Sequence, residues 1–248
     1  MTYCIGLYLE EGLVMLADTR TNAGVDNIST YSKTFTWEVQ GERALTLMTS
    51  GNLAVTQAVI HHLNAGLSSD SDPDAQPESL YSVASPFQAA RLVGRAVRRV
   101  YVEDAEAMRA QDASFQASFL LGGQIQGSEM ALFQIYSAGN FIRATQETPF
   151  LQIGEHKYGK PILDRALKYQ GAGVMDGVKL ALLSMDSTVR SNLSVGFPLD
   201  LVVMRRNEHR LTLKYRIEDN DPYFQKLSRD WSDALRAAYQ HLLPPEWL

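Results

Sequence analysis

Expected strands occur in blocks along this chain, and expected helices, mostly in pairs, separate the blocks. Alternating or continuous apolar residues joined by tight Gly-containing turns predict antiparallel hairpins, and apolar residues spaced by three and four predict helices. Because strands do not alternate one-for-one with helices, the order argues against a doubly wound parallel sheet and predicts helices layered on antiparallel sheets. The expected strand blocks are residues 2–18, 34–51, 114–155 and 199–218, and the expected helices are residues 52–67, 85–110, 160–170, 175–191 and 222–243.

Length, composition and charge are those of an ordinary globular protein. The chain has 248 residues, of which 45% are hydrophobic and 21% charged, and this fits one large domain or two small ones. A polar stretch with two prolines at residues 68–79 predicts a loop within a domain. The net charge of -5 gives no indication of nucleic acid or an anionic membrane as a partner. The apolar runs are too short for a membrane span and the first residues lack a secretion signal, so we expect a cytoplasmic protein.

Side chains that commonly build metal or cofactor sites are sparse. The one cysteine, Cys4, lies in an apolar run and is expected to be a buried core residue. His61 and His62 are adjacent on an expected helix and therefore face different directions. The sequence contains no nucleophile elbow, no P-loop and no dinucleotide-binding glycine motif. We therefore expect no metal and no cofactor.

Removal of Met1 would leave Thr2 at the N-terminus, and small second residues permit that removal. A terminal threonine carries both a nucleophilic hydroxyl and a base, because its free α-amine has an ordinary pKa of about 8. A nearby lysine would lower the pKa of the amine, and an aspartate would keep that lysine charged and oriented. Backbone N–H donors would also be needed to stabilise the oxyanion.

The chain supplies each of these parts in order. Asp18 ends the second expected strand, Lys33 precedes the next one, and residues 49–52 (TSGN) end a strand and start a helix with free N–H groups. Taken singly, each has a plain structural interpretation. Asp18 would be a turn residue, Lys33 an edge charge, and Ser50 or Asn52 a helix N-cap. The combination in this order favours a catalytic interpretation.

These motifs resemble the proteasome β-subunit family of N-terminal nucleophile hydrolases over nearly the whole chain. The details are most similar to a bacterial branch of this family called Anbu. The features that carry this resemblance are the Met-Thr start, the stretches DTRTNAG and MDSTVRSNLSVGFPLDL, and the helical C-terminal extension that ends in PPEWL. The resemblance implies an α+β fold, a four-layer αββα sandwich of two antiparallel sheets flanked by helices. It also implies one domain over residues 1–248, with a helical extension at about residues 221–248. The resemblance further implies a homo-oligomer, either a closed ring or an open helical assembly, that acts on a peptide or amide substrate. The sequence does not identify an ATPase partner.

The resemblance also implies roles for individual residues. Thr2 would be the nucleophile with its amine as the base, Lys33 would tune that amine, and Asp18 would pair with Lys33. The amide of Gly51 would bind the oxyanion. Asn22 would pair with an extended substrate, and Thr21, Tyr31, Thr49 and Leu53 would line the pocket for the residue before the cut. The implied supporting residues are Ser50, Glu155, Ser191 and Ser194.

The sequence departs from the family pattern around the expected nucleophile. Glu155 stands where the family has a serine and Ser191 where it has an aspartate, whereas Ser194 fits the second serine. Glu155 would either restore a charge near the amine or point into solvent. Three functions stay open: a threonine-dependent peptidase, an N-terminal hydrolase acting on small amides, and a non-catalytic assembly or binding subunit that keeps Met1.

Overall fold

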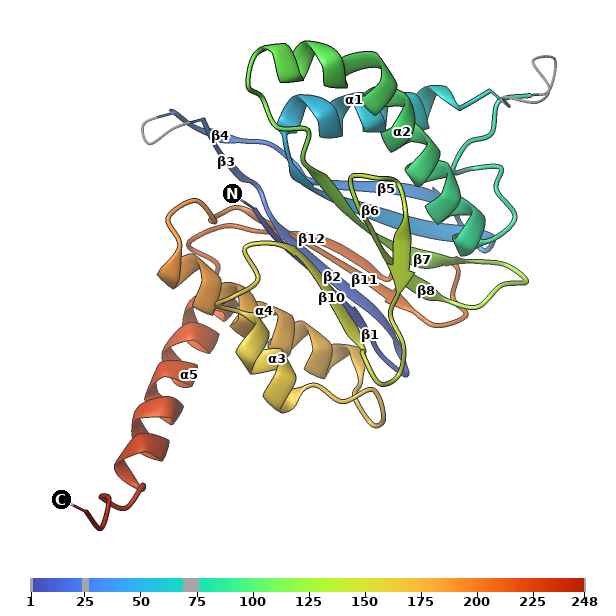
Figure 1. Cartoon of the computed structure of the whole chain (residues 1–248). Coiled ribbons are helices and arrows are strands. Elements are labelled where there is room, and N and C mark those ends of the chain that lie inside the picture. Colours follow the sequence, from blue (N-terminus) through green and yellow to red (C-terminus); the bar gives the residue numbers. More distant parts are fainter. Residues whose placement is uncertain (1, 24–26, 69–75, 248) are drawn as a thin grey trace.

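The computed structural model describes residues 2–23, 27–68 and 76–247, without the side chains of residues 22, 23 and 27. Two five-stranded antiparallel sheets face each other and helices cover their outer sides (Figure 1). The first sheet has the strand order β10 (Phe150–Gly154), β1 (Tyr3–Tyr8), β2 (Gly12–Asp18), β11 (Leu199–Arg205) and β12 (Leu213–Ile217). The second has the order β5 (Thr34–Val39), β6 (Arg43–Gly51), β7 (Ala117–Ile125), β8 (Ala131–Ile135) and β9 (Phe141–Arg143).

Three apolar cores separate four layers. Helices α1 (Leu53–Ala65) and α2 (Pro86–Ala110) pack on the second sheet. Helices α3 (Lys160–Ala166), α4 (Val174–Ser191) and the start of α5 (Pro222–Gln240) pack on the first sheet. The third core lies between the sheets. The expected four-layer αββα sandwich is therefore confirmed.

Strands β1 and β2 lie in the middle of this arrangement and are buried on both faces. Successive side chains of a strand point to opposite faces, so Ile5 and Leu16 face the helices while Cys4 and Met15 face the other sheet. This explains the uninterrupted apolar runs at the start of the sequence. Cys4 is buried as expected, and burial raises the pKa of its thiol, which keeps it protonated.

Most expected elements are confirmed, with two differences and one omission. Helix α3 is shorter than the expected 160–170, and α5 ends at Gln240, before the expected end at 243. The sequence interpretation missed the hairpin of β3 (Arg20–Ala23) and β4 (Asn27–Thr30), because its polar residues show no apolar alternation. Of the loop expected at 68–79, residues 69–75 lie outside the described part of the chain.

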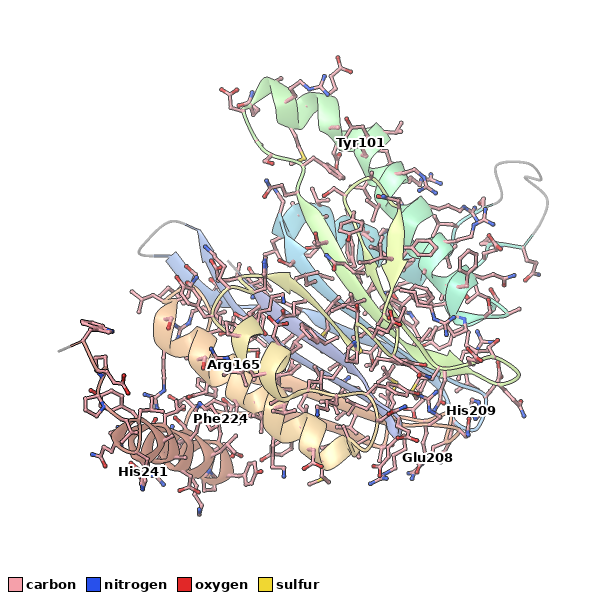
Figure 2. The ribbon with its side chains drawn as sticks, turned by 60° about the horizontal axis from the view of Figure 1, so that its bottom comes forward. Tyr101, Arg165, Glu208, His209, Phe224 and His241 are labelled. Atoms are coloured by element: carbon pink, nitrogen blue, oxygen red, sulfur yellow. The ribbon has the colours of Figure 1, made fainter. Side chains whose placement is uncertain are left out.

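Helix α5 leaves the body of the molecule (Figure 1). It is anchored through its first turns, where the Phe224 ring packs edge-on against Phe197 with 5.0 Å between centroids. Figure 2 shows Phe224 at the end of α5 nearest the body and His241 at the far end. Among the described residues, no helix is both long and apolar enough to cross a membrane.

Candidate functional site

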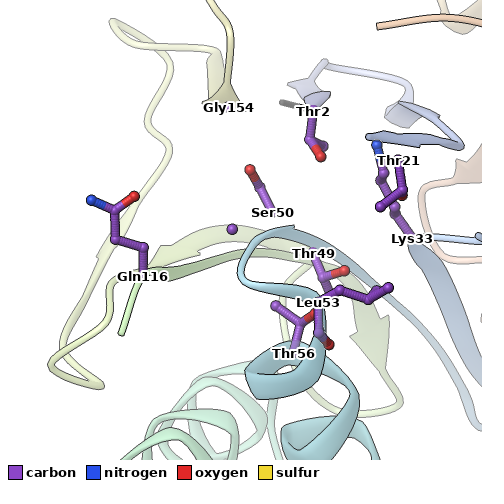
Figure 3. Close-up of a pocket in the computed structure, with 10 residues that line it drawn as sticks. Thr2, Thr21, Lys33, Thr49, Ser50, Leu53, Thr56, Gln116 and Gly154 are labelled. Carbon is purple, nitrogen blue, oxygen red and sulfur yellow. The ribbon is translucent and has the colours of Figure 1, made fainter. Parts of the chain in front are cut away.

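A cavity of about 290 Å³ lies where β1 begins and β6 ends. It brings together residues from the N-terminus, β3, the start of β5 and the β6–α1 junction (Figure 3). Seven residues expected at the site line it, namely Thr2, Thr21, Lys33, Thr49, Ser50, Gly51 and Leu53. Thr56, Gln116 and Gly154 also line it and were not expected.

Thr2 is held at the cavity wall by the pairing of β1 with β10. The Thr2 carbonyl accepts a hydrogen bond from the Glu155 N–H at 2.7 Å. Only 7% of the surface of Thr2 is exposed. Gly154 approaches the same carbonyl so closely that a Cβ atom there would collide with it, and its φ of 84° is one that other residues rarely adopt. Gly154 therefore allows the end of β10 to hold Thr2, the residue just before β1. Met1 lies outside the described residues.

A buried ion pair lies beside Thr2. Lys33 Nζ is 2.8 Å from Asp18 Oδ1 and also donates to the Arg20 carbonyl at 2.6 Å. The same Asp18 oxygen accepts from the Tyr3 N–H at 3.0 Å, and Oδ2 accepts from the Gly196 N–H at 3.4 Å. Asp18 is fully buried and Lys33 is 4% exposed.

The electrostatics of this pair follow from its burial. Burial raises the pKa of the Asp18 carboxyl above its ordinary value, and the Lys33 ammonium and the N–H groups of Tyr3 and Gly196 act in the opposite direction. Asp18 in turn fixes the Lys33 ammonium, which lines the cavity that Thr2 also lines.

The direction of the Gly51 N–H follows from the ladder of β6. Asn52 N–H bonds to the Gln116 carbonyl on the β7 side, and Thr49 N–H bonds to the Lys33 carbonyl on the β5 side. N–H groups alternate in direction along a strand, so the Gly51 N–H points to the β5 side. The pairing of β5 with β6 ends at Thr34 and Met48, so this N–H lies beyond the last β5 strand partner, at the cavity.

The loop from β6 to α1 has a local explanation. Gly51 has a φ of 115°, and a Cβ atom there would collide with the Gln116 carbonyl. The Asn52 side chain caps α1 by accepting from the N–H groups of Ala54 and Val55. The plain N-cap interpretation of Asn52 is therefore confirmed, and Ser50 instead lies at the cavity wall.

One residue expected to bind substrate is not at the cavity: Tyr31 is 42% exposed and is absent from the cavity lining. The expectation for Asn22 stays a prediction, because its side chain lies outside the described residues. Thr21, Thr49 and Leu53 do line the cavity. The Thr21 Oγ1 atom is buried and has no hydrogen-bond partner within the described part of the chain, so a bound ligand has a polar group to contact there.

The expected supporting residues are distributed differently. Glu155 is 7% exposed, and its carboxylate contacts Asn192 at 3.2 Å and Lys157 at 3.4 Å; the solvent-pointing alternative is therefore wrong. Ser191 is exposed on the last turn of α4, and Ser194 is half-buried in the following turn. Neither serine lines the cavity.

Several residues at or behind the cavity were missed by the sequence interpretation. Gly154 lets its backbone lie against the Thr2 carbonyl, and Gly196 donates its N–H to Asp18. Their only signal in the sequence is a glycine at the end of a strand and a glycine in a turn. Thr56 and Gln116 carry no signal, because their place depends on how α1 and β7 pack around Thr2. Among the described residues, no group of three or more His, Cys, Asp or Glu side chains is arranged to hold a metal ion.

Solved structures of Anbu proteins from three bacteria are similar to this chain over nearly its full length. Anbu from Hyphomicrobium sp. strain MC1 shares 48% identity with a TM-score of 0.86, over 98% of this chain and 99% of that one. The helical assembly of the Anbu complex from Pseudomonas aeruginosa shares 44% identity with a TM-score of 0.89, over 98% of each chain. Anbu, an ancestral β-subunit, from Yersinia bercovieri shares 42% identity with a TM-score of 0.88, over 98% of each. No protein-family model and no curated protein matches the chain.

Proposed function

Because this chain belongs to the Anbu family of ancestral proteasome-like β-subunits, we propose that it is a threonine-type peptidase whose nucleophile is Thr2 after removal of Met1. The observation that carries the proposal is the position of Thr2 in the wall of a cavity, beside the buried Lys33–Asp18 pair. The proposed site uses no metal and no cofactor.

The proposed first step forms an ester between Thr2 and the acyl part of the substrate. The Thr2 hydroxyl attacks the amide carbonyl and its proton passes to the free α-amine. Lys33 lowers the pKa of that amine by like-charge repulsion, and Asp18 holds Lys33 in place. The ammonium then gives its proton to the leaving amine.

The Gly51 N–H is the proposed donor to the oxyanion. Its direction into the cavity supports this role, because a preoriented donor stabilises the charge that develops on the carbonyl oxygen. A water molecule, activated by the same α-amine, would then hydrolyse the ester and regenerate Thr2.

We also propose that the chain self-associates in the cytoplasm. The support is the relative from Pseudomonas aeruginosa, which is described as a helical assembly. A heterologous interface produces either a ring or an open helix, depending on whether its rotation closes. Sedimentation of the purified protein at micromolar concentration is expected to show a species larger than one chain, and a stable monomer would contradict this.

The decisive experiment combines intact mass with substitution of Thr2. Protein from a host with ample methionine aminopeptidase is expected to be lighter by one methionine and to cleave peptides. Thr2→Ala is expected to lower turnover by on the order of 10³-fold or more without unfolding. The matched control is Thr148→Ala, at an exposed threonine, which is expected to retain turnover.

The same experiment separates the two alternatives. Hydrolysis of small acyl-amides without cleavage of peptides would favour an amidase. The motivation for this alternative is that Glu155 and Ser191 differ from the residues of the family pattern. Retention of Met1 in protein from its own cells would leave the amine blocked and would favour a non-catalytic assembly subunit. Turnover that survives Thr2→Ala would contradict the proposed nucleophile.

A further inference from the structure

Asn192 lies between the two backbone segments that hold Thr2 and Asp18, and the motifs of the sequence assign it no role. It caps the C-terminus of α4, where its N–H donates to the Thr188 carbonyl at 2.9 Å. Its side chain makes two further bonds: Nδ2 donates to Glu155 Oε2 at 3.2 Å, and Oδ1 accepts from the Ser194 N–H at 2.9 Å. A carboxylate needs a donor and a backbone N–H needs an acceptor, so one orientation of the amide satisfies both.

The first bond of Asn192 leads to the nucleophile. The Glu155 carboxylate that receives it is buried, and the N–H of the same residue donates to the Thr2 carbonyl at 2.7 Å. The other partner of this carboxylate, Lys157, has a side chain that is 70% exposed, so its contact is weakened by water. Asn192 therefore supplies the less exposed contact that holds residue 155 in position.

The second bond of Asn192 leads to the ion pair. It orders the turn that begins at Ser194 and that presents the Gly196 N–H to Asp18 Oδ2 at 3.4 Å. The other oxygen of Asp18 accepts from the N–H of Tyr3, the residue after Thr2. The contacts thus close a ring that runs from Thr2 through Glu155, Asn192 and Asp18 back to the start of β1.

We propose that Asn192 is a positioning residue which, through Glu155 and the turn at Ser194, sets Thr2 relative to Asp18. This inference rests on the proposed function, since Thr2 is the nucleophile only there. It assigns Glu155 a role as a hydrogen-bond acceptor and not as a charge acting on the α-amine. The contact between buried Glu155 and half-buried Asn192 thereby provides the link between β10 and α4.

The first test is the kinetic effect of Asn192→Ala. The change leaves a buried carboxylate short of a donor and the Ser194 N–H short of an acceptor. We expect kcat to fall by about 10-fold or more while KM changes by less than about 2-fold, because no cavity-lining residue is altered. The control is Asn140→Ala, at an exposed turn asparagine, which is expected to leave both parameters unchanged.

Glu155 variants distinguish positioning from charge. Glu155→Gln keeps an acceptor for Asn192 and loses the charge, so positioning predicts kcat within about 3-fold of wild type and an unshifted pH profile. Glu155→Ala loses the acceptor and is expected to resemble Asn192→Ala. A pH profile shifted by Glu155→Gln would overturn the positioning role in favour of a charge effect.

A reciprocal pair provides a rescue. Asn192→Asp alone sets two carboxylates against each other in a partly buried site and is expected to lower kcat more than Asn192→Ala does. When Asn192→Asp is combined with Glu155→Gln, the amide at residue 155 becomes the donor and the carboxylate at residue 192 becomes the acceptor. That carboxylate still accepts from the Ser194 N–H. We expect the double variant to regain kcat to within about 3-fold of wild type, and a double variant no better than Asn192→Asp would overturn the inference.

A readout without turnover keeps this inference separate from the proposed function. Amide hydrogen exchange of the full-length protein is expected to quicken at Glu155 and Gly196 by about 10-fold or more in Asn192→Ala, and not in Asn140→Ala. Unchanged exchange at both amides overturns the inference, even if the enzyme is active. A wild type with free Thr2 and no turnover overturns the proposed function, and the exchange result then still decides whether Asn192 organises the two segments.

Discussion

Replacement of Lys33 by Met tests the electrostatic basis of the site. Methionine keeps an unbranched apolar stem and removes the ammonium 2.8 Å from the fully buried Asp18 carboxylate. Removing one partner of a buried ion pair costs about 3–5 kcal/mol, because the other charge is left uncompensated. For a chain of this length each kcal/mol lowers Tm by about 2–4 °C, so we expect Lys33→Met to lower Tm by roughly 6–20 °C.

The pH dependence of this loss has a definite sign. Burial raises the pKa of Asp18 and Lys33 opposes that effect, so in Lys33→Met the folded protein holds the Asp18 proton at a pH where the unfolded chain has released it. Stability of the variant is therefore present at low pH and lost as the pH rises through the raised pKa. Urea unfolding is expected to show the difference from wild type widening as the pH rises above about 4, the ordinary pKa of an Asp carboxyl in the unfolded chain.

A double variant completes the test. Asp18→Asn with Lys33→Met removes both charges, so it is expected to be less destabilised than the sum of the single changes. Lys160→Met, which breaks an exposed pair with Asp164, is the control and should cost less than about 1 kcal/mol. A Lys33→Met protein as stable as wild type, or strict additivity in the double variant, would refute the reasoning.

Two further predictions concern the residues around Thr2. Gly154→Ala places a Cβ against the Thr2 carbonyl at a φ of 84°. We therefore expect thermal unfolding to show a free energy of unfolding lower by about 2 kcal/mol, and turnover at least about 10-fold lower. Wild-type turnover would contradict the role of Gly154. Burial raises the pKa of Tyr3 to about 12, so the folded chain keeps this proton above pH 10 and stability falls as the pH rises from about 10 to 12. The free energy of unfolding, measured by urea titration across that range, should fall less for Tyr3→Phe than for wild type, by up to about 3 kcal/mol. Parallel curves would show that Tyr3 does not contribute.

The contacts of this structure fall into two groups, local in the sequence and remote. The Asn52 and Ser85 side chains cap their helices by bonding to N–H groups within the next three residues, and such local contacts can be predicted from the neighbouring residues. The Glu155–Asn192 contact spans 37 residues and the Asp18–Gly196 contact spans 178. No local pattern encodes these contacts, since they depend on how α4 and β10 pack on β1.

The sequence by itself determined the order of most strands and helices, the burial of Cys4, and the grouping of Thr2, Asp18 and Lys33. It could do so because apolar periodicity records which face of each element avoids water, and because catalysis by an N-terminal threonine requires a lysine and an aspartate close to that residue. Only the tertiary structure decided that Glu155 turns inward to Asn192, that Tyr31 is not at the cavity, and that Gly154 meets Thr2. Those outcomes depend on close packing between elements remote in the chain, where a side chain's direction is set by its neighbours and not by its own residue type.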